Sequence, residues 1–244
     1  MLFAVVGFVV VGGAGEESPL LLGSVYDPVS LNGHAVAYDA ARKLAVIPSM
    51  GSDMVSVVSL SESSPTVVGR LHDRTRLNGA VHTTMDVEGH ALVAAYYSDA
   101  LTVVDISDPS KPFVSGYLVD SQRLGGARAV VYDSVRHLAV VAGYLSGTIA
   151  VITLLDPAQP TFVGALVGLS GPVAIALDTS GQRAFVALDR GDPLVIIGLE
   201  SPSNPAVATV LRDGRLKGVS AVAYQPGAPL ALICAQPGRK PSFS

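Results

Sequence analysis

Short apolar runs separated by turn residues recur along this chain. Between residues 80 and 118 the runs are Ala80–Met85, Ala91–Tyr96, Leu101–Ile106 and Phe113–Leu118, and Gly, Asp, Ser or Pro residues lie between them. Runs of about six residues that are rich in Val, Leu, Ile and Tyr, with such breaks between them, are typical of β-strands. We therefore predict four antiparallel strands in this stretch.

The same unit repeats with a nearly fixed period. The segments LTVVDISDPSKP, IAVITLLDPAQP and LVIIGLESPSNP begin at residues 101, 149 and 194. The aspartates that close the first run of each unit are 47, 47 and 45 residues apart, at Asp39, Asp86, Asp133 and Asp178. Four strands in a period of roughly 40 to 50 residues are typical of a propeller blade. The predicted fold is all-β, a β-propeller of four-stranded antiparallel blades, with residues 1–244 in a single domain.

The two ends of the chain look like complementary halves of one more blade. Four full units span residues 31–212, and residues 219–224 and 230–235 match only the first two strands of a fifth. Residues 8–11 and 20–25 match the third and fourth strands. We expect residues 1–25 to complete a fifth blade with the C-terminal strands, which removes exposed sheet edges. The alternative is an open fragment of a larger propeller, and residues 236–244 are predicted to be a flexible tail.

The first residues also have features of a signal peptide. Residues 2–11 form an apolar run of ten that is followed by small residues. No Lys or Arg precedes the run, whereas a secretory signal normally begins with basic residues. The run is also too short for a transmembrane helix, which needs about 20 apolar residues. The match to the repeat favours a strand and leaves the signal-like reading as the alternative.

Composition narrows the functional classes. The formal net charge is −4 and the isoelectric point is about 5.7, and no cluster of basic residues marks a nucleic-acid interface. Hydrophobic residues make up 49% of the chain and charged residues 15%, which is enough to build a large core. The lone cysteine, Cys234, lies in the apolar run LALICA, so we expect a buried thiol and no internal disulfide.

Proline and glycine mark the turns of each unit. Asp108, Pro109 and Pro112 end the pairing of the third run, because proline fixes φ and lacks an N–H group. A glycine precedes the first strand of each unit, where a positive φ or a close backbone approach is predicted: Gly33, Gly79, Gly126, Gly171 and Gly218.

The segment LTVVDISDPSKPFVSGYL, with RLNGA before it and RLGGARAVVYD after it, resembles the LVIVD-repeat β-propellers. The resemblance covers almost the whole chain and is strongest in residues 101–118 and 149–166. It implies a propeller fold and a binding or adhesion role, in proteins that are mostly extracellular or at the cell surface. It does not imply catalysis.

Residues at the starts of the innermost strands of a propeller line its central channel, where a ligand would be met. Counting back five positions from the residue that closes each run gives His34, Val81 with His82 beside it, Arg128, Val173 and Ser220. His34, His82 and Arg128 are therefore candidates to hold an anion at the channel mouth. The alternative is that they cap strands and contact water. Two histidines without nearby carboxylates make a poor metal site, so none is predicted.

The loops that enter the units carry paired charges. Asp73 with Arg76, Asp120 with Arg123, and Asp213 with Arg215 recur two or three residues apart. Repetition favours a structural role, in which each arginine bonds the local aspartate or carbonyl groups. The functional alternative is that Arg76, Arg123 and Arg215 form a charged rim that meets a partner.

No catalytic motif stands out in the sequence. Asp105 and Asp108 lie close enough to suggest calcium, but the equivalent positions in the next units carry Thr153 and Asp156, then Gly198 and Ser201. We therefore expect a non-enzymatic, monomeric scaffold that presents its loops to a protein or carbohydrate partner and uses no cofactor. The alternative is a hydrolase or lyase with its site at the channel mouth, recognisable by ionisable groups that converge in one pocket.

Overall fold

The computed structural model describes residues 5–10, 20–26, 33–61, 64–178, 180, 182–190, 194–216, 218–225 and 230–235. Within these residues the chain forms four four-stranded and two two-stranded antiparallel sheets. Its one described helix is the short 3₁₀ turn η1 (Gly214–Leu216). None of the described segments is a helix that is both long and apolar enough to cross a membrane.

Each four-stranded sheet is called a blade here and numbered along the chain. Blade 1 contains β3 (Ala37–Asp39), β4 (Leu44–Ser49), β5 (Met54–Ser59) and β6 (Thr66–His72). Blade 2 contains β7 (Ala80–Met85), β8 (His90–Ala95), β9 (Ala100–Asp105) and β10 (Phe113–Val119). Blade 3 contains β11 (Ala127–Asp133), β12 (Leu138–Gly143), β13 (Thr148–Thr153) and β14 (Thr161–Leu166). Blade 4 contains β15 (Pro172–Leu177), β16 (Arg183–Leu188), β17 (Leu194–Gly198) and β18 (Ala206–Leu211).

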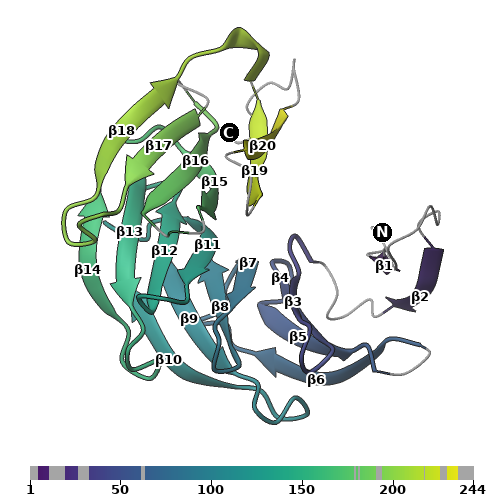
Figure 1. The fold of residues 1–244 in the computed structure, drawn as a ribbon. Coiled ribbons are helices and arrows are strands. Elements are labelled where there is room, and N and C mark those ends of the chain that lie inside the picture. The colour runs from purple at the N-terminus through teal and green to yellow at the C-terminus, as the bar shows by residue number, and fades with distance from the viewer. Residues whose placement is uncertain are drawn as a thin grey trace.

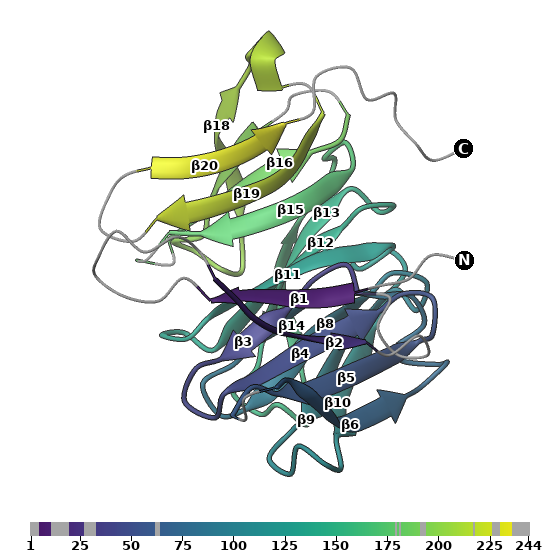
Figure 2. The same ribbon diagram turned by 90° about the vertical axis from the view of Figure 1, so that its right-hand side faces the viewer.

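The remaining strands form two half-blades. In one, β1 (Val5–Val10) pairs with β2 (Leu20–Tyr26), and in the other β19 (Val219–Gln225) pairs with β20 (Leu230–Ala235). Among the described residues no hydrogen-bonded ladder joins the two pairs. The sheets stand around a common axis, and β1–β2 lies at the open side of the ring, between β19–β20 and blade 1 (Figures 1 and 2). The predicted tail, residues 236–244, lies outside the described residues.

The core lies between the blades rather than within them. One apolar cluster combines residues of blades 1 and 2, such as Val46 and Val93, and another combines blades 2 and 3, such as Leu101 and Val141. A third combines blades 3 and 4, such as Val140 and Val186. Each blade therefore buries its apolar face against the next one. Middle strands such as β12, which is buried along its whole length, are covered on both faces.

Backbone contacts between blades recur at one glycine of the outermost strand. A Cβ atom added to Gly116 in β10 would lie 2.1 Å from the carbonyl oxygen of Pro157, in the turn between β13 and β14. Gly69 in β6 approaches Pro109 in the same way, and Gly164 in β14 approaches Pro202. The Asp108-Pro109 turn predicted from the sequence, and the equivalent turns at Pro157 and Pro202, thus also set the spacing between neighbouring blades.

One expectation about a single residue needs correction, and one about the glycines is met in two ways. Cys234 is exposed, not buried, because β20 is the outer strand of a half-blade and no third strand pairs with it among the described residues. The predicted positive φ is present at Gly79, Gly126, Gly171 and Gly218. Gly33 shows the predicted alternative, a close approach: it forms an isolated bridge to Ser49, and an added Cβ atom would lie 2.6 Å from Ile47 Cγ2.

Candidate functional site

Each innermost strand from blade 2 onward begins with a β-bulge. In β11 the register shifts between Ala127 and Ala129, so Arg128 is the extra residue of the bulge. The equivalent bulge positions in β7, β15 and β19 hold Val81, Val173 and Ser220. A bulge turns its side chain away from the regular alternation of the strand. Arg128 is the only charged residue among these four positions. We call the side of the molecule where the innermost strands begin the entry face.

A second set of equivalent positions follows the second strand of each blade, also on the entry face. These positions are occupied by Met50, Tyr96, Tyr144 and Asp189 in blades 1 to 4. The rings of Tyr96 and Tyr144 lie 6.3 Å apart, and the ring of Tyr97 meets that of Tyr96 edge-on at 5.2 Å. Tyr144 is buried, whereas Tyr97 is 61% exposed. A row of three tyrosine rings therefore runs from solvent into the interface between blades 2 and 3.

Two arginines flank the buried end of this row. The guanidinium carbon of Arg128 lies 5.5 Å from the centre of the Tyr144 ring, and that of Arg190 lies 5.8 Å from it. The Tyr144 hydroxyl donates to Asp189 Oδ2 at 2.9 Å and accepts a longer bond from Arg190 Nη2 at 3.4 Å. We call Tyr96, Arg128, Tyr144, Asp189 and Arg190 the Tyr–Arg cluster.

Electrostatics keep the two phenols of this cluster neutral. Burial raises the pKa of Tyr144, and its hydrogen bond to Asp189 raises it further. Burial and the neighbouring Tyr144 also raise the pKa of Tyr96, while Arg128 and Arg190 act in the opposite direction. Both hydroxyls thus remain hydrogen-bond donors at neutral pH, and the two guanidinium groups carry the positive charge.

Of the predicted channel-mouth residues, two lie on neighbouring innermost strands, and no described contact joins their side chains. His82 in β7 accepts a hydrogen bond at Nδ1 from the backbone N–H of Val130 in β11, at 3.3 Å. Arg128 lies two residues before Val130, on the same strand. His34 is exposed ahead of β3, and no described contact joins it to His82 or Arg128. Arg128 is thus the one predicted residue that belongs to the Tyr–Arg cluster, whose tyrosines and Arg190 the sequence reasoning did not single out. Comparing the residues that follow the second strand of each unit would have revealed them.

The predicted rim arginines are tied into their own loops. Arg76 Nε bonds Asp73 Oδ2 at 2.8 Å, and its guanidinium lies 5.3 Å from the Tyr117 ring. Arg123 Nε bonds Asp120 Oδ2 at 2.7 Å, and its guanidinium lies 3.7 Å from the Phe162 ring. Arg76 and Arg123 therefore each hold their own loop in place through an ion pair and an aromatic contact.

The third rim position gives less information. Arg215 falls in η1, and its side chain lies outside the described part of the structure.

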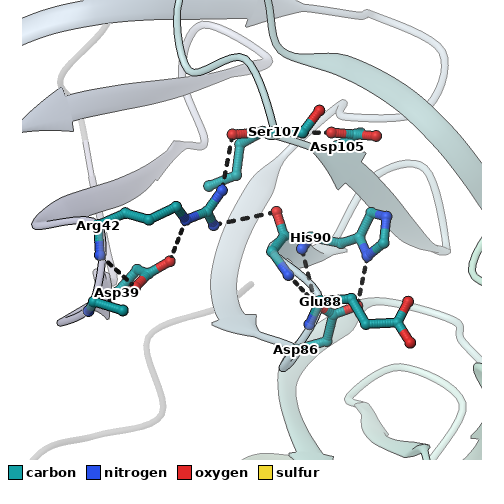
Figure 3. A network of polar contacts seen from close by, with 10 residues as sticks. Asp39, Arg42, Asp86, Glu88, His90, Asp105 and Ser107 are labelled. Carbon is teal, nitrogen blue, oxygen red and sulfur yellow. Dashed lines mark hydrogen bonds and ion pairs between the residues drawn. The ribbon is translucent and has the colours of Figure 1, made fainter.

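The opposite side of the molecule, where the first and second strands of each blade are joined, is called the turn face. Here Asp39 Oδ1 accepts the N–H groups of Ala41 and Arg42, and Arg42 Nε bonds Asp39 Oδ2 at 2.5 Å. Arg42 also donates to the carbonyl groups of Gly89 and Ile106 in blade 2 (Figure 3). Asp133 and Arg136 repeat this pattern, and Arg136 reaches Leu199 in blade 4. The Asp-x-x-Arg turn thus connects blade 1 to blade 2, and blade 3 to blade 4, through hydrogen bonds from its arginine to backbone carbonyl groups.

In blade 2 a glycine, Gly89, occupies the position of the arginine, and the next residue, His90, bonds the aspartate instead. Asp86 Oδ1 accepts the N–H groups of Glu88, Gly89 and His90, while Asp86 Oδ2 lies 2.7 Å from His90 Nδ1 (Figure 3). Ligand atoms of Asp86, Glu88 and His90 lie within 4.8 Å of one another. Both oxygens of Asp86 are already used by the turn, so this arrangement stabilises the hairpin and leaves Asp86 poorly suited to hold a metal. A shallow cavity of about 510 Å³ lies beside it, between residues 38–42 and 85–89.

The pKa values of His82 and His90 are shifted in opposite directions, which predicts opposite effects of pH on the free energy of unfolding. The hydrogen bond to Asp86 raises the pKa of His90 above its ordinary 6.5, despite burial, so this stabilisation is complete below pH 6.5 and is lost as the pH rises through the raised value. Burial lowers the pKa of His82, so its contribution is present above pH 6.5 and is lost as the pH falls.

We expect H90N to lose most stability relative to wild type near pH 5 and little near pH 8, and H82N to gain relative stability near pH 5. Asparagine keeps one hydrogen-bonding group near the position of Nδ1 in each case. Urea unfolding of the three proteins across this range measures the effect. Parallel pH profiles for all three would contradict it.

Solved structures share this fold at low sequence identity. A functionally unknown protein from Desulfotomaculum acetoxidans DSM 771 aligns with a TM-score of 0.71 and 11% identity over 88% of this chain and 66% of its own. A 6-phosphogluconolactonase candidate from Bacteroides uniformis ATCC 8492 aligns with a TM-score of 0.73 and 13% identity over 89% of this chain and 67% of its own. A chain in the crystal structure of a nidogen/laminin complex aligns with a TM-score of 0.61 and 15% identity over 85% of this chain and 73% of its own. This chain thus spans just under two thirds of the length of the first of these.

Sequence comparison identifies one unit of the repeat. No curated protein matches the chain at a significant level. The model of the LVIVD repeat family matches residues 88–119, which contain β8, β9 and β10. The resemblance noted in the sequence is confirmed for this segment, and the fold is propeller-like and all-β. Residues 88–119 of blade 2 are an LVIVD repeat.

Proposed function

We propose that this protein is a non-enzymatic binding scaffold that presents its entry face to a protein or carbohydrate partner. The observation that carries the proposal is the Tyr–Arg cluster, in which residues of blades 2, 3 and 4 meet. Elements that only build the scaffold recur from blade to blade, as the Asp-x-x-Arg turns do. A binding site must differ from one repeat to the next, and the positions of this cluster do differ.

The exposed side chains of the entry face support a role in recognition. Tyr97 is 61% exposed beside Tyr96, and Leu145, at the equivalent position of blade 3, is 65% exposed. Tyrosine and arginine are both enriched where proteins bind partners. The nidogen/laminin complex, which contains a chain of similar fold, is a precedent for partner binding by this architecture.

We also propose that the ring is closed as a five-bladed propeller, with β1 and β2 as the outer strands of the blade that β19 and β20 begin. The pairing of β1 with β2 supports this arrangement, because its register shifts beside the pair Phe8–Gly23. In blade 2 a register shift also lies beside the pair Val103–Gly116 of β9 and β10. The half-blade β1–β2 therefore has the backbone pattern of the outer half of a blade.

A hydrolase or lyase at the channel mouth is the second candidate. Its support is that ionisable groups converge on Tyr144 and that one protein of similar fold is a 6-phosphogluconolactonase candidate. Arginines that hold a substrate phosphate would suit such a reaction. Hydrolysis of sugar lactones by the purified protein, lost in R128Q, would favour this reading over a scaffold.

The scaffold proposal is tested by binding to an array that carries neutral and acidic glycans and peptides. We expect Y97A to lose binding because it removes the exposed ring of the entry face. Tyr38, on the turn face, is 55% exposed and provides the matched control Y38A, which should bind like wild type. Equal binding by all three proteins, or no binding by wild type to any probe, would refute an entry-face site.

A further inference from the structure

We propose that the Tyr–Arg cluster binds the acidic group of a saccharide, a carboxylate or sulfate on a sugar ring. This inference rests on the proposed binding function and assigns it a ligand class. Its basis is the position of two guanidinium groups, Arg128 and Arg190, beside the single ring of Tyr144. Planar guanidinium groups with several N–H donors are well suited to bind oxyanions through two hydrogen bonds at once.

Charge at the cluster favours an anionic ligand. The two arginines contribute +2 and Asp189 contributes −1, which leaves a net charge of +1 in a chain whose total is −4. Asp189 Oδ2 accepts the hydroxyl of Tyr144, and the Tyr144 hydroxyl is the only acceptor for Arg190 among the described hydrogen bonds. An oxyanion beside Tyr144 could accept charge-assisted hydrogen bonds from guanidinium groups of both arginines.

The repeats show that the blade does not need these arginines. The bulge that holds Arg128 is also present in β7 and β15, where valines occupy the same position. The position of Arg190 is held by Tyr97 in blade 2 and by Leu145 in blade 3. Because the strands form equally well with apolar residues there, the positive charge is not required for the fold.

Tyrosine rings next to the charge favour a saccharide over an acidic peptide. Tyr97 is exposed and touches Tyr96, which in turn lies beside Tyr144, the ring that both arginines approach. An amphipathic ring offers a flat apolar face and a polar edge, which match the face and the hydroxyl groups of a sugar. A sugar that bears an acid group would therefore contact the Tyr97 end with its ring and the arginines with its charge.

The test uses four probes: oligogalacturonate as a carboxylated saccharide, heparin-derived oligosaccharide as a sulfated one, neutral dextran oligomers, and polyglutamate. Wild type should bind at least one of the two acidic saccharides, more weakly as salt is raised. R128Q and R190Q should each weaken this binding by about tenfold or more, the typical effect of losing a charge-assisted hydrogen bond. K111Q, which removes an exposed charge at the turn between β9 and β10, should bind like wild type.

Several results would overturn the inference. Arg190 is exposed, so R190Q is expected to fold, and thermal unfolding of both variants checks this. Acidic saccharides that bind R128Q and R190Q as well as wild type would exclude the cluster, and binding to polyglutamate alone would assign it to acidic peptides. Binding to dextran alone that depends on Tyr97 would refute the anion site and leave the scaffold proposal intact. Absence of binding to every probe here and on the array would refute both.

Discussion

Replacing Gly116 with alanine is expected to lower the free energy of unfolding by roughly 3 kcal/mol, the upper end of what overpacking costs. The added Cβ would lie 2.1 Å from the carbonyl oxygen of Pro157 and 3.0 Å from backbone atoms of Ala158. These are backbone atoms of the next blade, so no side-chain rotation can relieve the clash. Blades 2 and 3 would have to move apart, which opens the apolar cluster that they share.

The matched control is Gly214→Ala. A Cβ at Gly214 meets no atom within 4 Å, and this glycine has no positive φ. Urea unfolding of the two variants and wild type gives the comparison, and the control should differ from wild type by about 0.5 kcal/mol or less. If Gly116→Ala is as stable as Gly214→Ala, the blades are not held at the spacing described.

The glycine position of the outermost strand, held by Gly116 in blade 2, also supports the proposed way of completing the ring. Gly69 and Gly164 occupy it in blades 1 and 3, and Gly23 holds the corresponding register in β2. Blade 4 has Thr209 there, and its outer strand β18 is exposed along nearly its whole length. In the proposed closed ring, a glycine at this place in β2 would allow the turn at Pro65 in blade 1 to approach, as Gly116 allows the approach of the turn at Pro157.

Most of the fold was predictable from local periodicity. The four runs predicted in residues 80–118 correspond to β7–β10. No observed strand boundary differs from its predicted position by more than one residue. Asp86 and Asp133 end their strands and cap the following turns through backbone N–H groups, as expected for aspartate in turns. These features depend on residues a few positions apart, which a sequence pattern records directly.

The candidate site was only partly predictable because it joins residues that are far apart in the chain. Arg128 was singled out from its register and stays a prediction, whereas Tyr96, Tyr144 and Arg190 follow the second strands of different blades and meet only when the blades pack. The exposure of Cys234 was missed for a related reason. An apolar run indicates a strand, but whether a further strand covers it depends on the rest of the ring.

The repeats also predict how β20 and β1 would pair in a closed ring, since no ladder joins these two strands among the described residues. In blade 3, β12 and β13 pair so that Ala142 lies opposite Ile149. Alignment of the half-blades with blade 3 places Cys234 at the position of Ala142 and Val6 at that of Ile149. In a closed ring Val6 would therefore lie directly opposite Cys234.

A cysteine at position 6 should then form a disulfide with the native Cys234. Directly opposed residues of an antiparallel pair have Cα atoms roughly 4.5 to 5.5 Å apart, within the range that a disulfide spans. The bond would close a loop of more than 200 residues, so the chain-entropy model gives a stabilisation of about 5 kcal/mol. V5C is the matched control, because successive side chains of a strand point to opposite faces of the sheet.

The most direct test of the proposed ring is peptide mass spectrometry of oxidised, non-reduced V6C and V5C. Closure predicts a peptide that links residue 6 to Cys234 within one chain of V6C, together with higher resistance to urea that is lost on reduction. It predicts no such peptide in V5C. A V6C protein that keeps two free thiols, or cross-links no better than V5C, would contradict a propeller closed by its two ends.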